Sequence, residues 1–145
     1  MRATMMLADS AQAINGKLYL LGGGWSVTGP HATPMAIAMT IEIPWDQTNI
    51  RHSYRLILND ADGKKVLLPT KDGNMPLEIV RNFEVGRPPG HIPGTPISFV
   101  QAVNFGPLPL RHGARYIWEL SINDESSPEW SRGFSVRPPK EEKEE

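Results

Sequence analysis

The chain has 145 residues, a formal net charge of −1 and no cysteine. This length suits a single domain with its own core, and the absence of cysteine excludes disulfides, thiolate metal ligands and a cysteine nucleophile. The near-neutral charge predicts neither a nucleic acid nor a membrane as partner.

The N-terminal segment is short and apolar. Residues 3–8 predict a strand, and residues 9–14 predict one helical turn capped by Asp9 or Ser10. The apolar run superficially resembles a signal peptide, but Asp9 ends it before it reaches the roughly seven to fifteen apolar residues that such a peptide needs. No stretch approaches the roughly 20 apolar residues of a membrane helix, so we expect a cytoplasmic protein.

A glycine run interrupts the next strand. Asn15-Gly16 predicts a hairpin turn or a tight corner before a strand at residues 17–21, and three glycines at 22–24 precede its continuation at residues 25–28. Glycines after a strand also occur in phosphate-binding loops, but those loops require a helix to follow. Residues 26–34 contain two prolines and predict no helix, so we interpret the glycines as a bulge or corner.

The middle of the chain alternates between apolar and small or polar residues. Residues 35–43 predict a long half-buried strand, with Met and Ile on one face and Ala, Thr and Glu on the other. Residues 53–58 and 65–68 predict a hairpin around Asp60 and Asp62. A similar acidic pair occurs in calcium loops, but Leu58 stands at the first ligand position, so we favour the hairpin.

Turn signals separate the remaining strands, which we expect at residues 77–85, 97–105, 115–122 and 134–136. Eight or nine short strands without helical periodicity indicate an all-β fold, an antiparallel two-sheet sandwich. We expect one domain over residues 1–137 and a disordered charged tail over residues 138–145. The predicted core consists of apolar strand residues: Ile37, Met39, Ile41, Leu56, Leu58, Phe99, Val103, Tyr116, Trp118 and Leu120.

Candidate binding residues stand in turns and loops. Trp25 and Trp45 each lie beside a Gly or Pro turn, and an exposed tryptophan at a strand end often marks a contact surface. Arg87 and His91 belong to the Pro- and Gly-rich residues 86–96, which predict an extended, solvated connection. We take these four residues as the candidate binding residues.

No catalytic residue, metal ligand or cofactor is predicted. No serine has a nucleophile elbow around it, and context singles out no pair of carboxylates. The histidines are far apart in sequence, without a carboxylate at metal-ligand spacing, so we expect solvent-facing imidazoles. They are His31, His52, His91 and His112.

Two stretches resemble a known family. Residues 7–11 run into Gly-Lys-Leu-Tyr-Leu-Leu-Gly-Gly-Gly-Trp at 16–25, and residues 113–123 read Gly-Ala-Arg-Tyr-Ile-Trp-Glu-Leu-Ser-Ile-Asn. Together they resemble an uncharacterised family of short bacterial and phage proteins with an immunoglobulin-like sandwich. The resemblance implies that fold and carries no activity or ligand.

The second stretch is also similar to the tyrosine corner of Greek-key sandwiches. There a tyrosine hydroxyl forms a hydrogen bond with the backbone a few residues upstream. Leu110, Gly113 and Tyr116 occupy the matching positions. Two residues separate the glycine from the tyrosine here, where the usual motif has one.

Three functional hypotheses follow. We favour a non-catalytic binding or assembly module with a protein partner or self-association, for example a structural or accessory subunit of a larger assembly such as a phage particle. The first alternative is a small-molecule or carbohydrate-binding sandwich that uses Trp25 or Trp45 as a stacking platform. The second is a metal-dependent enzyme with a site assembled from loops.

The N-terminal strand permits two interpretations. Residues 3–8 carry no charge, and uncharged edge strands with unpaired amides are sites of self-association. The strand is therefore either a contact for another chain or a member of its own sheet.

Overall fold

The computed structural model describes residues 1–140, which form β-strands and one short 3₁₀ turn. The all-β prediction is confirmed. The strands are β1 (Arg2–Ile14), β2 (Lys17–Gly23), β3 (Val27–Thr28), β4 (Met35–Ile43), β5 (His52–Asp60), β6 (Leu67–Thr70), β7 (Gly73–Pro76), β8 (Glu78–Phe83), β9 (Ile97–Phe105), β10 (Arg115–Ile122) and β11 (Glu125–Val136), and the turn is η1 (Trp45–Gln47). Of the predicted tail, residues 138–140 are exposed without regular structure, and residues 141–145 lie outside the described part.

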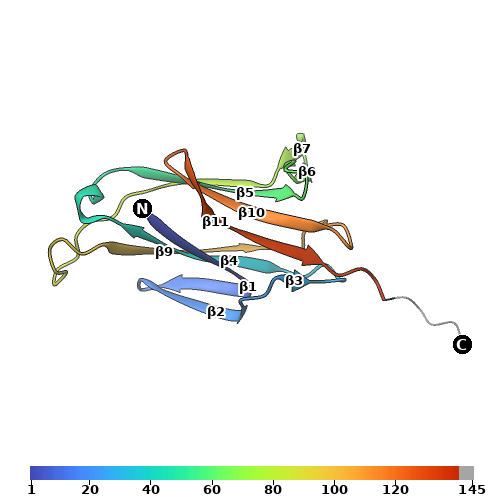
Figure 1. Ribbon diagram of the computed structural model, residues 1–145, viewed down its shortest axis with the longest axis horizontal. Helices are drawn as coiled ribbons and strands as arrows, with labels where there is room; N and C mark the ends of the chain where they lie inside the picture. Colours follow the sequence, from blue (N-terminus) through green and yellow to red (C-terminus); the bar gives the residue numbers. More distant parts are fainter. Residues whose placement is uncertain (141–145) are drawn as a thin grey trace, which may run out of the picture.

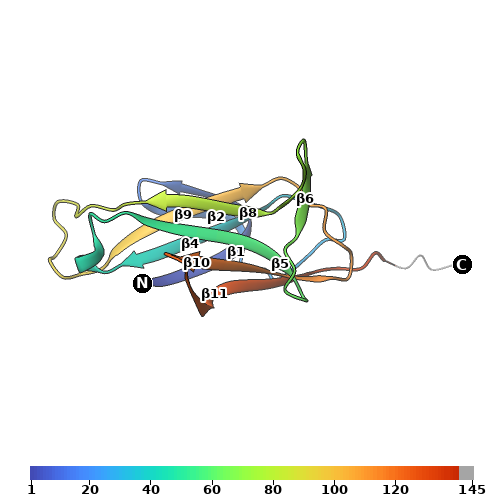
Figure 2. The same cartoon turned by 90° about the horizontal axis from the view of Figure 1, so that it is seen from above.

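Two main sheets run along the long axis of the molecule (Figures 1 and 2). The first has the strand order β2-β1-β4-β9, and the second has the order β3-β11-β10-β5-β8. Neighbours in both sheets are antiparallel except β3, which pairs in parallel with the end of β11. The predicted antiparallel pairing therefore holds for most strand pairs, and the second sheet is mixed because of β3.

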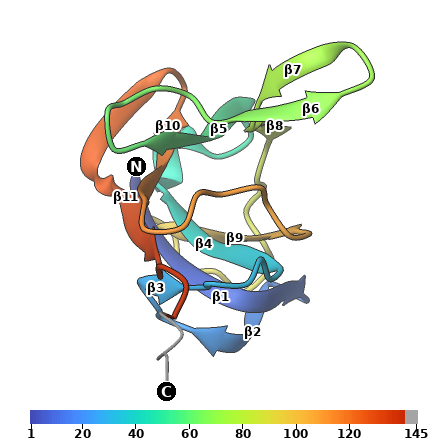
Figure 3. The same ribbon diagram turned by 90° about the vertical axis from the view of Figure 1, so that its right-hand side faces the viewer.

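The structure has eleven strands in its described part, where eight or nine were predicted. The small β6–β7 hairpin accounts for part of the difference and projects from the body in Figure 3. The predicted turn after β5 is confirmed, because the Lys64 carbonyl accepts a hydrogen bond from the Asp60 N–H. The following strand, β6, pairs with β7. The residues just before it are joined to β5 by the Asn59↔Lys65 bridge and by a hydrogen bond from the Val66 N–H to the Leu58 carbonyl at 2.9 Å.

The two main sheets enclose one apolar core. Buried side chains from both sheets form a single cluster, to which the inward-facing residues of β4, β5 and β10 contribute most of the fully buried members. Nine of the ten predicted core residues are buried, and the tenth, Phe99, is partly buried and stacks on Phe83 with ring centroids 4.8 Å apart. Burying each such large apolar side chain stabilises a fold by about 1.5–3 kcal/mol.

Side-chain hydrogen bonds join the two sheets. Arg132 Nε on β11 donates to the Met5 carbonyl on β1 at 2.8 Å. The Tyr54 hydroxyl on β5 donates to Gln101 Oε1 on β9 at 3.0 Å. Burial raises the pKa of Tyr54, and the positive charge of Arg81 partly offsets that effect.

Tyr116 forms the contact expected of a tyrosine corner. The Arg111 backbone N–H donates to the Tyr116 hydroxyl at 2.8 Å. Gly113 has a φ of +75°, and its N–H donates to the Val136 carbonyl at 2.8 Å. The extra residue between glycine and tyrosine therefore leaves the hydroxyl-to-backbone contact intact.

The N-terminal strand is longer than predicted and pairs inside its own sheet. β1 continues without interruption to Ile14, so the helical turn predicted at residues 9–14 is wrong. Pairing with β2 keeps this segment extended, and Asn15 and Gly16, both with positive φ, form the predicted two-residue hairpin turn into β2. Met5 and Leu7 are 2% exposed and belong to the core.

The turn end of the β1–β2 hairpin packs against the outer face of β4 and β9 and lies beneath these two strands in Figure 3. Small side chains at this contact allow the strands to approach closely. They form a second buried cluster of Ala8, Ala11, Ala36 and Ala38, against which Leu18, Leu20 and Ala102 pack. The interpretation of β4 as half-buried is therefore wrong at its beginning, where both faces are covered.

One side chain fastens this hairpin to the sheet. Asn104 on β9 accepts a hydrogen bond from the Ala11 N–H at 3.1 Å and donates one to the Ala11 carbonyl at 2.8 Å. The Asn104 carboxamide thus replaces a neighbouring strand for Ala11.

Candidate functional site

Trp45 and Arg87, two of the four candidate binding residues, lie in direct contact. The Arg87 guanidinium carbon is 4.1 Å from the centroid of the Trp45 ring, a cation–π arrangement. Arg87 Nε donates to Thr48 Oγ1 at 2.7 Å, and its terminal nitrogen donates to the Trp45 carbonyl at 2.8 Å. Arg87 therefore fastens the connection after β8 to η1 and covers one face of Trp45.

His52 lies near this cluster and contradicts the expectation of four solvent-facing histidines. It is 6% exposed, with Nε2 2.8 Å from the Gln47 carbonyl and Nδ1 3.0 Å from Asn123 Nδ2. Asn123 Oδ1 accepts from the Ser53 N–H, so Asn123 Nδ2 is the donor to Nδ1. A neutral ring with its proton on Nε2 satisfies every partner, and we assign His52 a structural role.

Trp25 and His91 lie apart from that cluster. Trp25 is partly buried and packs edge-on against Phe134, with ring centroids 5.9 Å apart. Its indole Nε1 is buried without a hydrogen-bond partner. His91 is exposed, and its backbone N–H donates to the Pro88 carbonyl at 3.2 Å. The structure therefore does not bring the four candidate residues together in one site.

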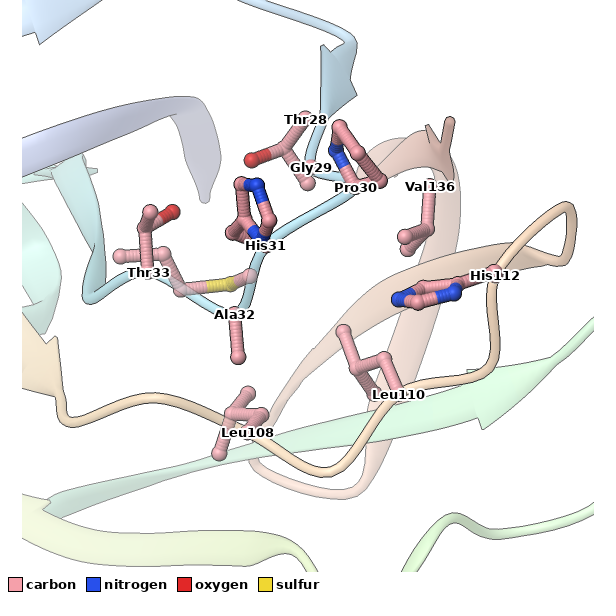
Figure 4. Close-up of a pocket in the computed structure, with 11 residues that line it drawn as sticks. Thr28, Gly29, Pro30, His31, Ala32, Thr33, Leu108, Leu110, His112 and Val136 are labelled. Carbon is pink, nitrogen blue, oxygen red and sulfur yellow. The ribbon is translucent and has the colours of Figure 1, made fainter. Parts of the chain in front are cut away.

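A small cavity lies between the loop after β3 and the loop before β10 (Figure 4). His112 lies beside Leu110 and Val136, whereas His31 lies on the loop across from them. The cavity has a volume of about 40 Å³. This space holds a few water molecules and is far below the roughly 300 Å³ of a typical metabolite site. Within residues 1–140, no three His, Asp or Glu side chains are grouped to hold a metal ion.

The Asp60 turn is occupied by its own backbone. Asp60 Oδ1 accepts hydrogen bonds from the N–H groups of Asp62 and Lys64, both at 2.9 Å. These contacts agree with the hairpin interpretation of this segment. An open groove of about 750 Å³ runs from this turn to Arg111 and Arg115.

The most distinctive exposed apolar site is the edge strand β2. Tyr19 is 54% exposed and Leu21 is 73% exposed, and alternate residues of a strand share a face. Because Ile14 and Lys17 flank a two-residue turn and pair directly, the N–H and C=O groups of Tyr19 and Leu21 point toward β1. Those of Leu18 and Leu20 point outward.

The contacts of the hairpin support this assignment of the outward-facing groups. Ala11 lies opposite Leu20, and its backbone groups bind Asn104 on the side away from β2, as the alternation requires. Within the described part of the chain, no hydrogen bond covers the outward backbone groups of Leu18 and Leu20. This strand therefore offers both free backbone groups and exposed apolar side chains.

The sequence contained part of this signal. Residues 18–21 read Leu-Tyr-Leu-Leu with no charged residue on either face. A strand that is apolar on both faces is expected to be packed on both. In this fold the face of Leu18 and Leu20 is packed, and the face of Tyr19 and Leu21 is exposed. The sequence does not show which face stays open, because the Asn104 contact spans 93 residues.

A model of the Family of unknown function (DUF6941) matches residues 3–134. The chain belongs to this family. The match runs from β1 into the last part of β11 and agrees with the expectation of an uncharacterised family. No curated protein and no solved structure matches the DUF6941 chain.

Among the described residues of this DUF6941 member, no helix has the length and apolar character needed to cross a membrane.

Proposed function

We propose that this protein is a non-catalytic binding or assembly module that contacts another polypeptide by strand addition at β2. The observation that carries the proposal is the combination of free outward backbone groups at Leu18 and Leu20 with exposed Tyr19 and Leu21. In strand addition, backbone hydrogen bonds supply affinity and alternate side chains supply specificity. A subunit of a larger particle is one form that such a module takes.

We also propose that the sandwich is immunoglobulin-like. In support, three neighbouring strands of one sheet, β1-β4-β9, lie against four of the other, β11-β10-β5-β8. The hydrogen bond from the Arg111 N–H to the Tyr116 hydroxyl, at the start of β10, is the corner contact that accompanies this topology. Immunoglobulin-like domains serve many unrelated functions, so the fold leaves the site to decide the function.

The alternative functions have weaker support. A carbohydrate-binding sandwich needs an open tryptophan face, but Arg87 covers one face of Trp45 and Trp25 packs against Phe134. A loop-sited enzyme needs convergent polar groups. His31 and His112 border a cavity of only about 40 Å³.

Selection of short peptides from a random display library tests strand addition. We expect the selected peptides to shift the backbone amide resonances of Leu18 and Leu20, because these N–H groups would donate to the added strand. A Tyr19→Lys/Leu21→Lys variant should lose these peptides, whereas Val80→Lys, at a 57% exposed position of β8, should retain them. Peptides that bind elsewhere, or that bind the double variant equally well, would contradict the proposal.

A further inference from the structure

We propose that the strand added at β2 is β2 of a second copy of this chain, in an antiparallel, two-fold symmetric pair centred on Leu20. This inference rests on the proposed use of β2 as a contact strand and names its partner. The pair would join two four-stranded sheets into one continuous sheet across the dimer. Two-fold dimers are the commonest symmetric assemblies, and each requires one patch that complements itself.

The sequence of β2 is self-complementary in this register. The outward-facing groups of Leu20 pair with those of the second Leu20, and Leu18 pairs with Gly22. Tyr19 of each copy then faces Leu21 of the other across a position without direct hydrogen bonds, where side chains approach most closely. The two most exposed apolar side chains of the strand therefore cover each other.

Charge favours the same register. Lys17 is the only charged residue of β2, and it lies opposite Gly23 of the second copy, so no like charges meet.

The other edges of the main sheets are less suited to pairing. β8 carries Glu78 and Arg81, and charges on an edge oppose pairing between chains. β9 has no large apolar side chain among the strongly exposed ones, and β3 has only two residues. A seven-residue strand pair buries less area than a standard interface, so we expect a dimer with a dissociation constant in the micromolar range.

Sedimentation equilibrium tests the dimer over protein concentrations from about 5 to about 500 μM. We expect the full chain to pass reversibly from monomer to dimer over this range. Tyr19→Lys/Leu21→Lys places two Lys–Lys pairs across the contact and should weaken the dimer at least about tenfold. Val80→Lys adds one exposed charge on β8 and should leave the dissociation constant unchanged.

A charge-complementary variant tests the register itself. Tyr19→Glu/Leu21→Lys places the introduced carboxylate of each copy opposite the introduced ammonium group of the other, so we expect dimerisation to return to within about threefold of the wild type. Its dimer should weaken with added salt more than the wild-type dimer does. Both double variants change exposed side chains, and circular dichroism should show that they fold.

Three results would overturn the inference: a wild-type monomer at every concentration, a Lys/Lys variant that dimerises like the wild type, or a Glu/Lys variant no better than the Lys/Lys variant. A wild-type monomer that still binds selected peptides at Leu18 and Leu20 would remove the second copy and leave strand addition standing. Failure of both measurements would remove both proposals.

Discussion

Replacement of Asn104 by alanine tests how the β1–β2 hairpin is held. The variant removes the acceptor for the Ala11 N–H and the donor to the Ala11 carbonyl. Each lost hydrogen bond costs about 0.5–1.5 kcal/mol, and a buried backbone group left without a partner costs about 1–3 kcal/mol. Ala11 is 3% exposed, whereas Asn104 is open to water, so we expect a total loss of about 2 kcal/mol.

Hydrogen exchange and urea unfolding measure this loss in different ways. If the hairpin opens alone, amides of β1 and β2 that pair beyond Ala8 should exchange about 30-fold faster, the equivalent of about 2 kcal/mol, while β10 is unaffected. If the hairpin unfolds only with the rest, the free energy of unfolding falls by the same amount. Asn82→Ala, at an exposed position on β8, is the matched control and should change stability by less than about 0.5 kcal/mol. An Asn104→Ala variant indistinguishable from that control would show that Leu18 and Leu20 hold the hairpin by packing alone.

Three further predictions concern the backbone turn and two tyrosines. Gly22→Ala should lower stability in urea by more than about 1 kcal/mol, because Gly22 has a φ of +61° and a Cβ would collide with Asp9. Adding Asp9→Ala removes the collision and should recover only that part of the lost stability. Complete recovery of the stability would refute the backbone contribution. Tyr116→Phe leaves the Arg111 N–H without its acceptor and should cost about 1 kcal/mol, against little change for Tyr19→Phe at an exposed site; equal effects would refute the corner contact. Because burial raises the pKa of Tyr54 in the folded state, the unfolded state releases its proton first, and stability should decline as the pH rises above about 10. Tyr54→Phe should flatten this decline, and an unchanged pH profile would contradict the assignment.

The alternating strands were predictable because local periodicity encodes them. Residues 35–43, 97–105 and 115–122 form strands with the predicted bounds, since apolar residues at every second position fix the buried face. β11 was mostly missed. Its first part contains Pro128, and the pairing with β10 shifts from Glu119↔Ser131 to Ser121↔Ser126, which leaves residues 127–130 in a bulge.

The sites depended on contacts between distant segments and were less predictable. Trp45 and Arg87 were both chosen as candidate binding residues, but nothing local shows that they stack on each other across 42 residues. The burial of Ala36 and Ala38 depends on a hairpin from elsewhere in the chain. Their small side chains are typical of a solvent-facing strand as well as of a close contact, so the pattern alone does not distinguish the two.

The hydrogen bond between Arg132 and Met5 has a consequence for the order of folding. It joins residues 127 positions apart, and β1 and β11 contact each other along one side of the core between the two main sheets. During synthesis, β1 therefore emerges before the other strands. Its contact with β11 forms only after almost the whole domain has been synthesised. Chains dominated by such distant pairings fold slowly, on the scale of milliseconds to seconds. Until that moment Met5 and Leu7 remain accessible to other chains, so the apolar N-terminal strand is a hazard of the nascent protein that the finished fold removes.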